Sequence, residues 1–571
     1  MKASDLITRI LVDQGVTHVY EMVGGMITHI LDSMAIDGRI TIVSMHHEQA
    51  AAFAAEGHSR MAGKPLVAMA TSGPGATNLL TGIGSCFFDS IPAVFITGQV
   101  NRHEMKGSLG VRQLGFQETD IVAMARPVTK LSIQVLKPED LQSTLELAFR
   151  LAQEGRPGPV LVDIPMDIQR ADLEWIPNQV TEVTVPALDT SLTKDLLDSL
   201  ELAQRPIILL GGGIRSGNAK AALDLFLEKI QIPICLSLMG VDAVHASHPL
   251  RVGLIGSYGN RWANHALGTS DCLLVLGSRL DIRQTGADTA SFRGDKKIFH
   301  VDCDAAEMNN RIKDCFTFDI ELQAFLHQVT NICGTRIIRT SEKWFSTIDG
   351  LKAQYPENLE LAEYPGINPN HLMHEISSKS SAASAVVTDV GQHQMWAAQS
   401  WDVAIGQRFL TSGGMGSMGF SVPAAIGASF AANRSPVVVI AGDGGFQCNI
   451  QELETIRRNS LPIKMIILDN GCHGMVRQFQ ESYFDSRFQS TVEGYSAPAF
   501  EKVANAYAIP SLRIAANQDL SQAMDWLWKA EGPALLSIAI DGSTNVYPKL
   551  AFGRQFTEME PQAKPLDMEG T

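Results

Sequence analysis

Two short apolar segments that both end in polar residues constrain the fold of this chain most. Residues 437–441 run directly into Gly442-Asp443-Gly444-Gly445, and residues 463–468 run into Asp469-Asn470-Gly471. Each pattern predicts a buried strand, the first ending in a glycine turn, and the helical pattern of residues 449–459 between them predicts a parallel pair. The carboxylate of Asp443 and the amide of Asn470 then lie at the carboxyl edge, where open α/β sheets bind ligands. Such oxygen ligands suit Mg²⁺, which keeps part of its water shell and bridges to a diphosphate.

Two glycine-containing segments of the same region predict phosphate-binding turns. Asp389-Val390-Gly391-Gln392-His393-Gln394 ends a predicted strand, and residues 411–419 have the sequence TSGGMGSMG. Backbone N–H groups that glycine leaves accessible, or that a helix start exposes, bind phosphate well. Either turn alone is unremarkable, but together with the metal pair they predict one cradle for a diphosphate.

The length and charge of the chain limit its class. At 571 residues it is too long for one hydrophobic core. The formal net charge of −15 argues against nucleic acid and against an anionic membrane as a partner. The N-terminus lacks the apolar run of a signal peptide, and no segment approaches the roughly 20 apolar residues of a membrane span. The eight cysteines include no C-x-x-C pair, which indicates reduced thiols, so we predict a cytoplasmic protein.

Apolar runs alternate with helical patterns along most of the chain, which predicts parallel sheets covered on both faces. The runs are residues 18–23, 40–45, 65–71, 93–97 and 159–164, then 207–210, 234–238, 272–276 and 298–302, and finally 385–389, 437–441, 463–468 and 534–540. We therefore predict an α/β protein of three doubly wound parallel-sheet domains, at residues 1–170, 186–333 and 365–545. The first and third are similar in size and rhythm, and the C-terminal tail, 546–571, has no clear periodicity.

A glutamate stands at a strand end in the first domain. Glu48 follows the predicted strand 40–45 and precedes the small-residue helix 50–62. A glutamate in the first turn of a helix usually complements the helix dipole, and on its own Glu48 is open to that interpretation. The segment 71–78, TSGPGATN, follows the next predicted strand and favours a functional role.

Residues 46–83 resemble the pyrimidine-binding domain of thiamine-diphosphate (ThDP) enzymes, and the paired strand ends described above resemble the ThDP signature. The resemblance implies that Glu48 hydrogen-bonds the aminopyrimidine of the cofactor and promotes loss of the proton at thiazolium C2. It also implies that Asp443, Asn470 and the backbone carbonyl of Cys472 hold the metal. Because the two cofactor-binding domains meet across a subunit interface in this family, at least a homodimer is implied.

The resemblance also assigns cofactor contacts. An apolar residue at the place of Met418 is wedged between the two cofactor rings in the family. One departure is Asp469, where the family usually has a second asparagine; it precedes the ligand position, so we expect the site to be kept. The positions assigned to the cofactor are Gly391, Gln392, His393, Gln394, Gly414, Met415, Met418, Gly442, Gly444, Gly445, His473, Gly474 and Met475.

Four further segments narrow the resemblance. Residues 116–118, 155–165, 391–396 and 474–478 together resemble the acetolactate synthase large-subunit family, and the likeness covers roughly residues 3–548. In that family the middle domain holds an FAD that performs no redox chemistry in the main reaction. The positions that match its FAD contacts are Arg156, Gly211, Gly212, Gly213, Ser257, Tyr258, Arg279, Asp302 and Cys303. From the residues alone, only the glycine turn and Asp302 at a strand end indicate a nucleotide.

The family also provides expectations for the substrates. It places Gln117 beside the reacting carbons and Arg283 against the carboxylate of the acceptor, to which a guanidinium can donate two parallel hydrogen bonds. Phe116, Val476 and Phe479 match substrate contacts, and Phe479 stands where a tryptophan usually favours a larger second 2-keto acid. We expect transfer of a two-carbon unit from pyruvate to a ketone acceptor, with acetolactate as the default product.

Three departures keep alternatives open. Met166 replaces a usual lysine, Ile282 replaces a usual aspartate, and the loop 101–115, with Lys106 and Arg112, is longer than usual. These features are similar to related carboligases that transfer the two-carbon unit to keto-deoxysugar nucleotides and make branched-chain sugars. A pyruvate oxidase with redox-active FAD is a further alternative, and retention of the metal pair and the glutamate argues against an inactive binding protein. The binding of a regulatory subunit is left open.

Overall fold

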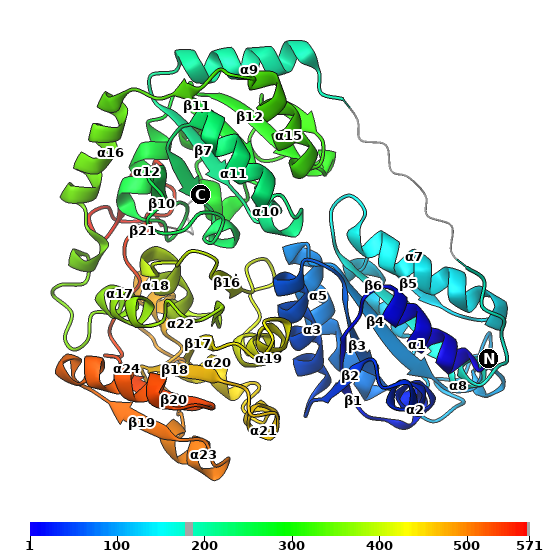
Figure 1. Ribbon diagram of the computed structural model, residues 1–571. Helices are drawn as coiled ribbons and strands as arrows, with labels where there is room; N and C mark the ends of the chain where they lie inside the picture. The colour runs from blue at the N-terminus through cyan, green and yellow to red at the C-terminus, as the bar shows by residue number, and fades with distance from the viewer. Residues whose placement is uncertain (178–186, 568–571) are drawn as a thin grey trace.

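The computed structural model describes residues 1–177 and 187–567, and its framework is three six-stranded sheets in which every strand pair is parallel (Figure 1). Helices cover both faces of each sheet, as the alternation of apolar runs and helical patterns predicted. The predicted α/β class with three parallel-sheet domains is confirmed. The predicted domain boundaries stay predictions.

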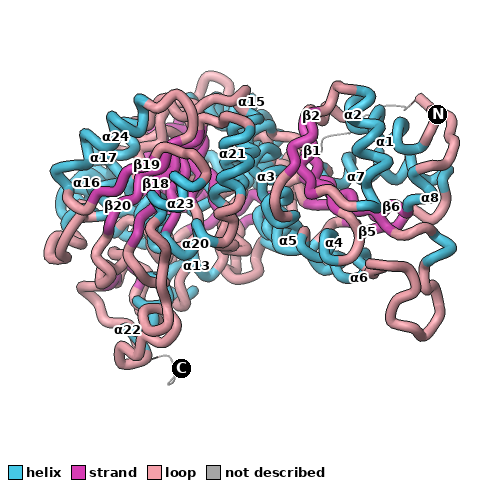
Figure 2. Tube along the Cα trace, turned by 90° about the horizontal axis from the view of Figure 1, so that it is seen from below, coloured by secondary structure: helices cyan, strands magenta, loops and turns pink. Residues whose placement is uncertain are grey.

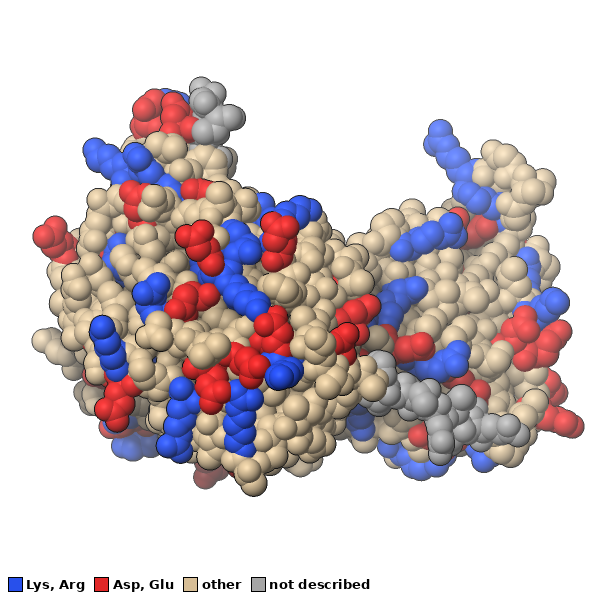
Figure 3. All heavy atoms as spheres, turned by 90° about the horizontal axis from the view of Figure 1, so that it is seen from above, with Lys and Arg blue, Asp and Glu red and all other residues tan. Residues whose placement is uncertain are grey.

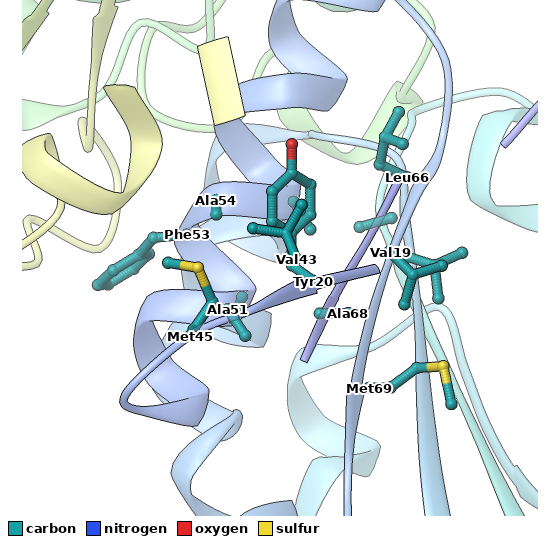
Figure 4. Packing of buried hydrophobic residues seen from close by; sticks show 14 of the residues in the cluster. Val19, Tyr20, Val43, Met45, Ala51, Phe53, Ala54, Leu66, Ala68 and Met69 are labelled. Carbon is teal, nitrogen blue, oxygen red and sulfur yellow. The ribbon is translucent and has the colours of Figure 1, made fainter. Parts of the chain in front are cut away.

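The first sheet has the strand order β2-β1-β3-β4-β6-β5. Its strands are β1 (His18–Met22), β2 (Thr41–Ser44), β3 (Leu66–Ala70), β4 (Ala93–Gln99), β5 (Leu131–Gln134) and β6 (Pro159–Pro165). Its main helices are α1 (Ala3–Asp13), α2 (Thr28–Asp37), α3 (Glu48–Ala62), α5 (Leu80–Asp89) and α7 (Leu141–Gln153). The small residues of α3 let it lie close to the sheet: Figure 4 shows Ala51 and Ala54 facing Tyr20 and Val43, while Phe53 points away.

The middle sheet has the order β10-β9-β7-β11-β12-β13. Its strands are β7 (Pro206–Leu210), β9 (Ile234–Leu236), β10 (Arg251–Leu254), β11 (Cys272–Leu276), β12 (Lys297–Asp302) and β13 (Phe316–Asp319). Counted along the chain, this is the 3-2-1-4-5-6 order of dinucleotide-binding folds, in which the ligand lies where the order reverses. That point lies at the carboxyl ends of the neighbouring strands β7 and β11.

The third sheet has the order β16-β15-β17-β18-β20-β19, which repeats the pattern of the first. Its strands are β15 (Ala385–Thr388), β16 (Arg408–Thr411), β17 (Val437–Gly442), β18 (Ile463–Asp469), β19 (Ser511–Ile514) and β20 (Ala534–Ala539). Its helices include α18 (Gln392–Ser400), α19 (Ser421–Ala431), α20 (Asp443–Gln447), α21 (Glu452–Arg458) and α22 (Gly474–Tyr483).

In the three six-stranded sheets, the strands that sequence patterns missed lie at sheet edges. These are β5, β10, β13, β16 and β19, each of four residues. Edge strands are short and less buried, so they lack the continuous apolar run by which the central strands are recognised.

One local expectation was wrong. The glycine turn predicted at Gly442–Gly445 is a helix start, because α20 begins at Asp443 directly after β17. The tail, whose sequence has no clear periodicity, contains one strand pair: β21 (Lys549–Leu550) pairs antiparallel with β22 (Met559–Glu560). The tail also packs on the middle domain, where the Arg261 side chain donates to the carbonyl of Met559 at 3.1 Å.

The first and third domains meet through α3 and α19, with α3 lying between the two sheets in Figure 2. Glycines let the backbones of the two helices come into direct contact. A methyl carbon added at Gly57 would lie 2.2 Å from the carbonyl oxygen of Ala424, and one added at Gly427 would lie 1.8 Å from the carbonyl oxygen of Ala54. Phe53 of α3 packs edge-on against Phe420.

On the face shown in Figure 3, basic and acidic side chains are interspersed rather than gathered by sign. All eight cysteines are free thiols. Among the described residues, no helix combines the length and the apolar character that crossing a bilayer requires.

Candidate active site

The predicted metal pair lies at the carboxyl edge of the third sheet. Strands β17 and β18 pair with Gly442 opposite Leu468, so Asp443 and Asn470 follow the ends of neighbouring strands. The Asp443 side chain is buried, and its Oδ2 atom has no hydrogen-bond partner. Burial raises the pKa of Asp443 to about 6; the nearby carboxylate of Asp469 adds to this increase and Tyr495 opposes it. A bound cation would satisfy this oxygen and favour the ionised form, so the site fits a metal.

The turn after β18 orients the other expected ligands. The Asn470 amide donates to Gln392 Oε1 at 3.0 Å, and its oxygen accepts the Cys472 N–H at 3.3 Å. The Cys472 carbonyl accepts the Gly474 N–H at 3.0 Å, which leaves that oxygen a second lone pair. Gly474 is required for close packing, because a methyl carbon there would lie 1.9 Å from Gln392 Oε1. Gln392 and Gly474 therefore lie against Asn470, and the His473 ring lies beside Gly444.

The glycine segment 413–419 is held by a carboxylate that sequence reasoning did not single out. Asp389, at the end of β15, accepts the N–H groups of Gly419 and Ser421 and the Ser421 hydroxyl, all within 2.9 Å. A methyl carbon at Gly445 would lie 2.3 Å from Asp389 Oδ1. Asp389 therefore joins both glycine segments, 413–419 and 442–445, at one edge of the sheet. Its place at a strand end was visible in the sequence, but its partners were not.

Other expected cofactor contacts differ in burial. His393 is buried beside Gly442 and Gly391, and burial lowers its pKa to about 4, so the ring is neutral at pH 7. Gln394 is also buried and donates to the Thr411 hydroxyl at 2.6 Å. The side chains of Met415 and Met418, by contrast, are exposed. The exposed methionines belong to the glycine segment 413–419 and are free to contact a ligand.

In the first domain, two expected catalytic residues lie around one turn. Glu48 is buried at the start of α3, and its Oε2 accepts the Asn78 amide at 2.9 Å. A methyl carbon at Gly75 would lie 3.2 Å from Glu48 Oε1, and one at Gly73 would lie 2.9 Å from the Gln117 Cβ. Gln117 has φ of 65°, an uncommon value for a residue other than glycine. The turn after β3 therefore brings Glu48 and Gln117 together.

A cavity of about 350 Å³ lies at the β7–β11 reversal point. Its walls come from all three domains: Phe88 and Asp89 from the first, Met395 and Gly414 from the third, and most of the rest from the middle one. The predicted residues that line it are Arg156, Gly212, Gly213, Ser257, Tyr258, Arg279, Arg283, Asp302 and Cys303. Gly211 does not line it; its N–H donates to the Leu276 carbonyl.

The cavity is polar at one end. Burial raises the pKa of Asp302 to about 6, and Arg156, which forms ion pairs with Asp304 and Glu307, opposes this increase. Arg156 also donates to the Ser90 hydroxyl at 2.8 Å. Asp302 at the end of β12 and the glycine turn after β7 are the groups that a dinucleotide-binding fold presents to a ribose and to phosphate. The cavity therefore fits a nucleotide.

The expected substrate contacts are exposed and lie in two domains. Phe116 is 78% exposed in the first domain, whereas Val476 and Phe479 are 52% and 41% exposed on α22 in the third. Arg283 lines the cavity, and none of the carboxylates among residues 1–177 and 187–567 lies within ion-pair distance of its guanidinium. That guanidinium is available to a ligand carboxylate.

Comparisons with known proteins agree with this geometry. Three family descriptions match: "Thiamine pyrophosphate enzyme, N-terminal TPP binding domain" at residues 1–124, the "central domain" at 193–329 and the "C-terminal TPP binding domain" at 389–538. These matches place the chain among the thiamine-diphosphate enzymes.

Curated relatives narrow the class. The chain is 37% identical over 564 residues to the acetolactate synthase isozyme 2 large subunit of Escherichia coli, covering 98% of this chain and 99% of the relative. It is 33% identical to the acetolactate synthase large subunit of Lactococcus lactis, covering 97% and 95%, and 35% identical to the chloroplastic acetolactate synthase of Arabidopsis thaliana, covering 98% and 84%. The chain belongs to the acetolactate synthase large-subunit family, which confirms the resemblance seen in its motifs.

Proposed function

We propose that this protein is a ThDP-dependent carboligase that transfers a two-carbon unit from pyruvate to a ketone acceptor, by default a second 2-keto acid. The observation that carries the proposal is the pairing of Asp443 and Asn470 at one sheet edge in a chain that aligns over almost its whole length with acetolactate synthases. ThDP, when bound, serves as the electron sink for decarboxylation. The protein must bind, orient and shield the reactants.

Mg²⁺ belongs to this proposal, with Asp443, Asn470 and the Cys472 carbonyl as its protein ligands. The partnerless Asp443 Oδ2 supports it. Among residues 1–177 and 187–567 no cluster of three His, Cys, Asp or Glu side chains could hold a metal, but the proposed set needs only one such side chain. Mg²⁺ favours few protein oxygens together with water and phosphate oxygens.

Removing the metal should abolish activity. Dialysis against a chelator should strip Mg²⁺ and with it ThDP, because the diphosphate then loses its bridging cation. Adding Mg²⁺ and ThDP together should restore turnover of pyruvate, measured by its consumption, whereas ThDP alone should not. Full activity in the stripped protein would contradict the proposed metal site.

We include FAD as a bound cofactor without a redox role in the main reaction. The supporting observations are the 3-2-1-4-5-6 strand order, the cavity at its reversal point and the place of Asp302 in that cavity. Residues Arg156, Gly212, Gly213, Ser257, Tyr258, Arg279 and Cys303 would complete the lining.

A homo-oligomer, at least a dimer, is also part of the proposal. Large apolar side chains are exposed near both halves of the site. They are Leu109, Val111, Leu114 and Phe116 in the first domain, and Met415, Met418, Val476, Phe479, Phe484 and Val492 in the third. Exposed apolar surface of this kind marks interaction sites, and a second copy of the chain would cover it. A cytoplasmic location is proposed from the free thiols; three relatives, all from plants, are named as chloroplastic.

The acceptor would be oriented by groups from two domains. The unpaired guanidinium of Arg283 can hold a carboxylate with two hydrogen bonds, and Gln117 can donate to a developing alkoxide. Phe479 leaves more room than a tryptophan and offers no indole N–H, so selection for 2-ketobutyrate over pyruvate should be weak.

The alternative acceptor, a keto-deoxysugar nucleotide, would have to place its diphosphate near Lys106 and Arg112. Lys106 donates to the Arg112 carbonyl, so this loop is folded on itself.

A competition experiment tests the acceptor. Pyruvate would be supplied alone and with a 4-keto-deoxysugar nucleotide, with products identified by mass spectrometry and flavin absorbance followed in the same cuvette. We expect acetolactate to form at the same rate in both, with no bleaching of the flavin. If the sugar adduct predominated, the acceptor would be the keto-deoxysugar nucleotide and not a second 2-keto acid. If the flavin were reduced stoichiometrically, the protein would be a pyruvate oxidase.

A further inference from the structure

We propose that Glu452, the first residue of α21 in the third domain, is a positioning residue that fixes the place of Glu48 in the first domain. It acts through the short turn that precedes Glu48. This role rests on the proposed ThDP chemistry, in which Glu48 promotes loss of the proton at thiazolium C2.

The connection between β2 and α3 is short. Strand β2 ends at Ser44 and helix α3 begins at Glu48, so residues 45–47 alone set where the helix starts. His47 caps the helix, because its Nδ1 accepts the Gln49 N–H at 3.1 Å. Glu48 is the first residue of the helix, so any shift of the turn moves its side chain directly.

Glu452 holds the middle of this turn. Its Oε1 accepts the backbone N–H of His46 at 2.9 Å. Its Oε2 accepts the Thr455 hydroxyl at 2.7 Å, and the Thr455 oxygen lies 3.0 Å from Nδ1 of His46. Because the hydroxyl proton points to Glu452, that oxygen accepts the ring N–H of His46. The Glu452 side chain is fully buried, so water does not compete for these donors. Glu452 therefore holds the His46 peptide directly and the His46 ring through Thr455.

Neighbouring residues of the third domain hold both ends of the segment 44–49. The Arg458 guanidinium, at the end of α21, donates to the Ser44 carbonyl. The Asn449 amide, just before α21, donates to Gln49 Oε1 at 3.3 Å. The segment that carries Glu48 is therefore bound to the third domain before, within and after the turn.

The first domain orients only part of Glu48 by itself. The Asn78 amide donates to Glu48 Oε2 at 2.9 Å, which directs the carboxyl group. The place of the Glu48 backbone depends on the turn, and hence on the acceptor that Glu452 provides for His46. Proton transfer needs donor and acceptor at a defined separation, so this placement bears on the rate.

Glu452→Ala tests the role, because it removes both oxygens and leaves the His46 N–H without its acceptor. Hydrogen–deuterium exchange at thiazolium C2, followed by NMR at saturating ThDP and Mg²⁺, should slow about tenfold, because displacing a reacting group by about 1 Å can cost up to roughly a hundredfold. Backbone hydrogen–deuterium exchange should become faster in peptides that cover residues 44–50. Glu452→Gln should keep both rates close to those of the wild type, since the amide oxygen can still accept the His46 N–H.

Gln407→Ala is the matched control. Gln407 is a buried side chain of the third domain that accepts the Trp401 indole N–H at 2.9 Å and donates to the Ser380 carbonyl at 3.0 Å. Its replacement removes buried hydrogen bonds at another place in the same domain. It should lower the thermal midpoint without changing exchange at C2 or at residues 44–50.

If Glu452→Ala gave only the result expected of Gln407→Ala, the positioning role would be overturned. Equal slowing of C2 exchange in Glu452→Gln would also overturn it, because the acceptor for His46 would then not be what matters. Should Glu452→Ala fail to fold, Thr455→Val removes the hydroxyl between Glu452 and the His46 ring, and unchanged exchange at both places in that variant would contradict the role. Glu48→Gln, measured in parallel, separates the two hypotheses: unchanged C2 exchange there would refute the proposed chemistry of Glu48 itself.

Discussion

Gly427→Ala should destabilise the native protein by about 3 kcal/mol, the upper part of the range for overpacked interiors. The added methyl carbon would lie 1.8 Å from the Ala54 carbonyl oxygen, so α19 would have to move away from α3. The neighbour is backbone in a buried helix and not the end of a flexible side chain, so the contact cannot relax locally. Differential scanning calorimetry should show a lower unfolding midpoint.

Gly350→Ala provides the matched control. Gly350 lies inside α16 (Glu342–Gln354), is exposed, and has no atom within 4 Å of the position of an added methyl carbon. Alanine there should stabilise the protein by about 0.5–1 kcal/mol, because glycine has the poorer helix propensity. Equal effects of the two substitutions would show that the α3–α19 contact is less rigid than the structure indicates.

Glu48→Gln should lower kcat at least about a hundredfold, the contribution expected of a group that holds and transfers a proton. The amide keeps the shape of the carboxyl group and its contact with Asn78, so ThDP should still bind with nearly unchanged affinity. The direct measurement is hydrogen–deuterium exchange at thiazolium C2, followed by NMR, which should slow in parallel with kcat.

Glu21→Gln is the comparison for this variant. Glu21 is also a buried glutamate of the first domain, and its Oε1 accepts the Ser44 hydroxyl at 2.6 Å. Its replacement removes a buried carboxylate at a different place, so kcat should stay close to that of the wild type. Unchanged C2 exchange in Glu48→Gln would rule out the proton-transfer role.

The sequence predicted those parts of the site whose positions follow from where the predicted strands end. Asp443 and Asn470 come directly after long apolar runs, and parallel strands bring such positions to one edge. Glu48 was placed in the same way, after β2. Five of the six edge strands escaped, because a strand of four partly exposed residues carries little pattern; the sixth, β2, was predicted.

What could not be predicted depends on how the domains pack. Asp89 accepts hydrogen bonds from residues more than 320 positions away, and nothing near it in the sequence indicates those partners. Phe88, Met395 and Gly414 line the cavity but belong to different domains. The shape of the cavity therefore depends on how the three domains pack together. Asp389 was visible as a strand-end carboxylate, but its three donors come from residues about thirty positions later.

The contact between α3 and α19 is reciprocal. Each helix connects the second and third strands of its own sheet in chain order, and each carries an alanine three residues before its glycine, at Ala54 and Gly57 and at Ala424 and Gly427. Each glycine meets the other helix at that alanine. A self-complementary contact of this kind is the geometry of a two-fold dimer. Because both halves belong to one chain, their association is intramolecular, and dilution that separates two subunits leaves this interface intact.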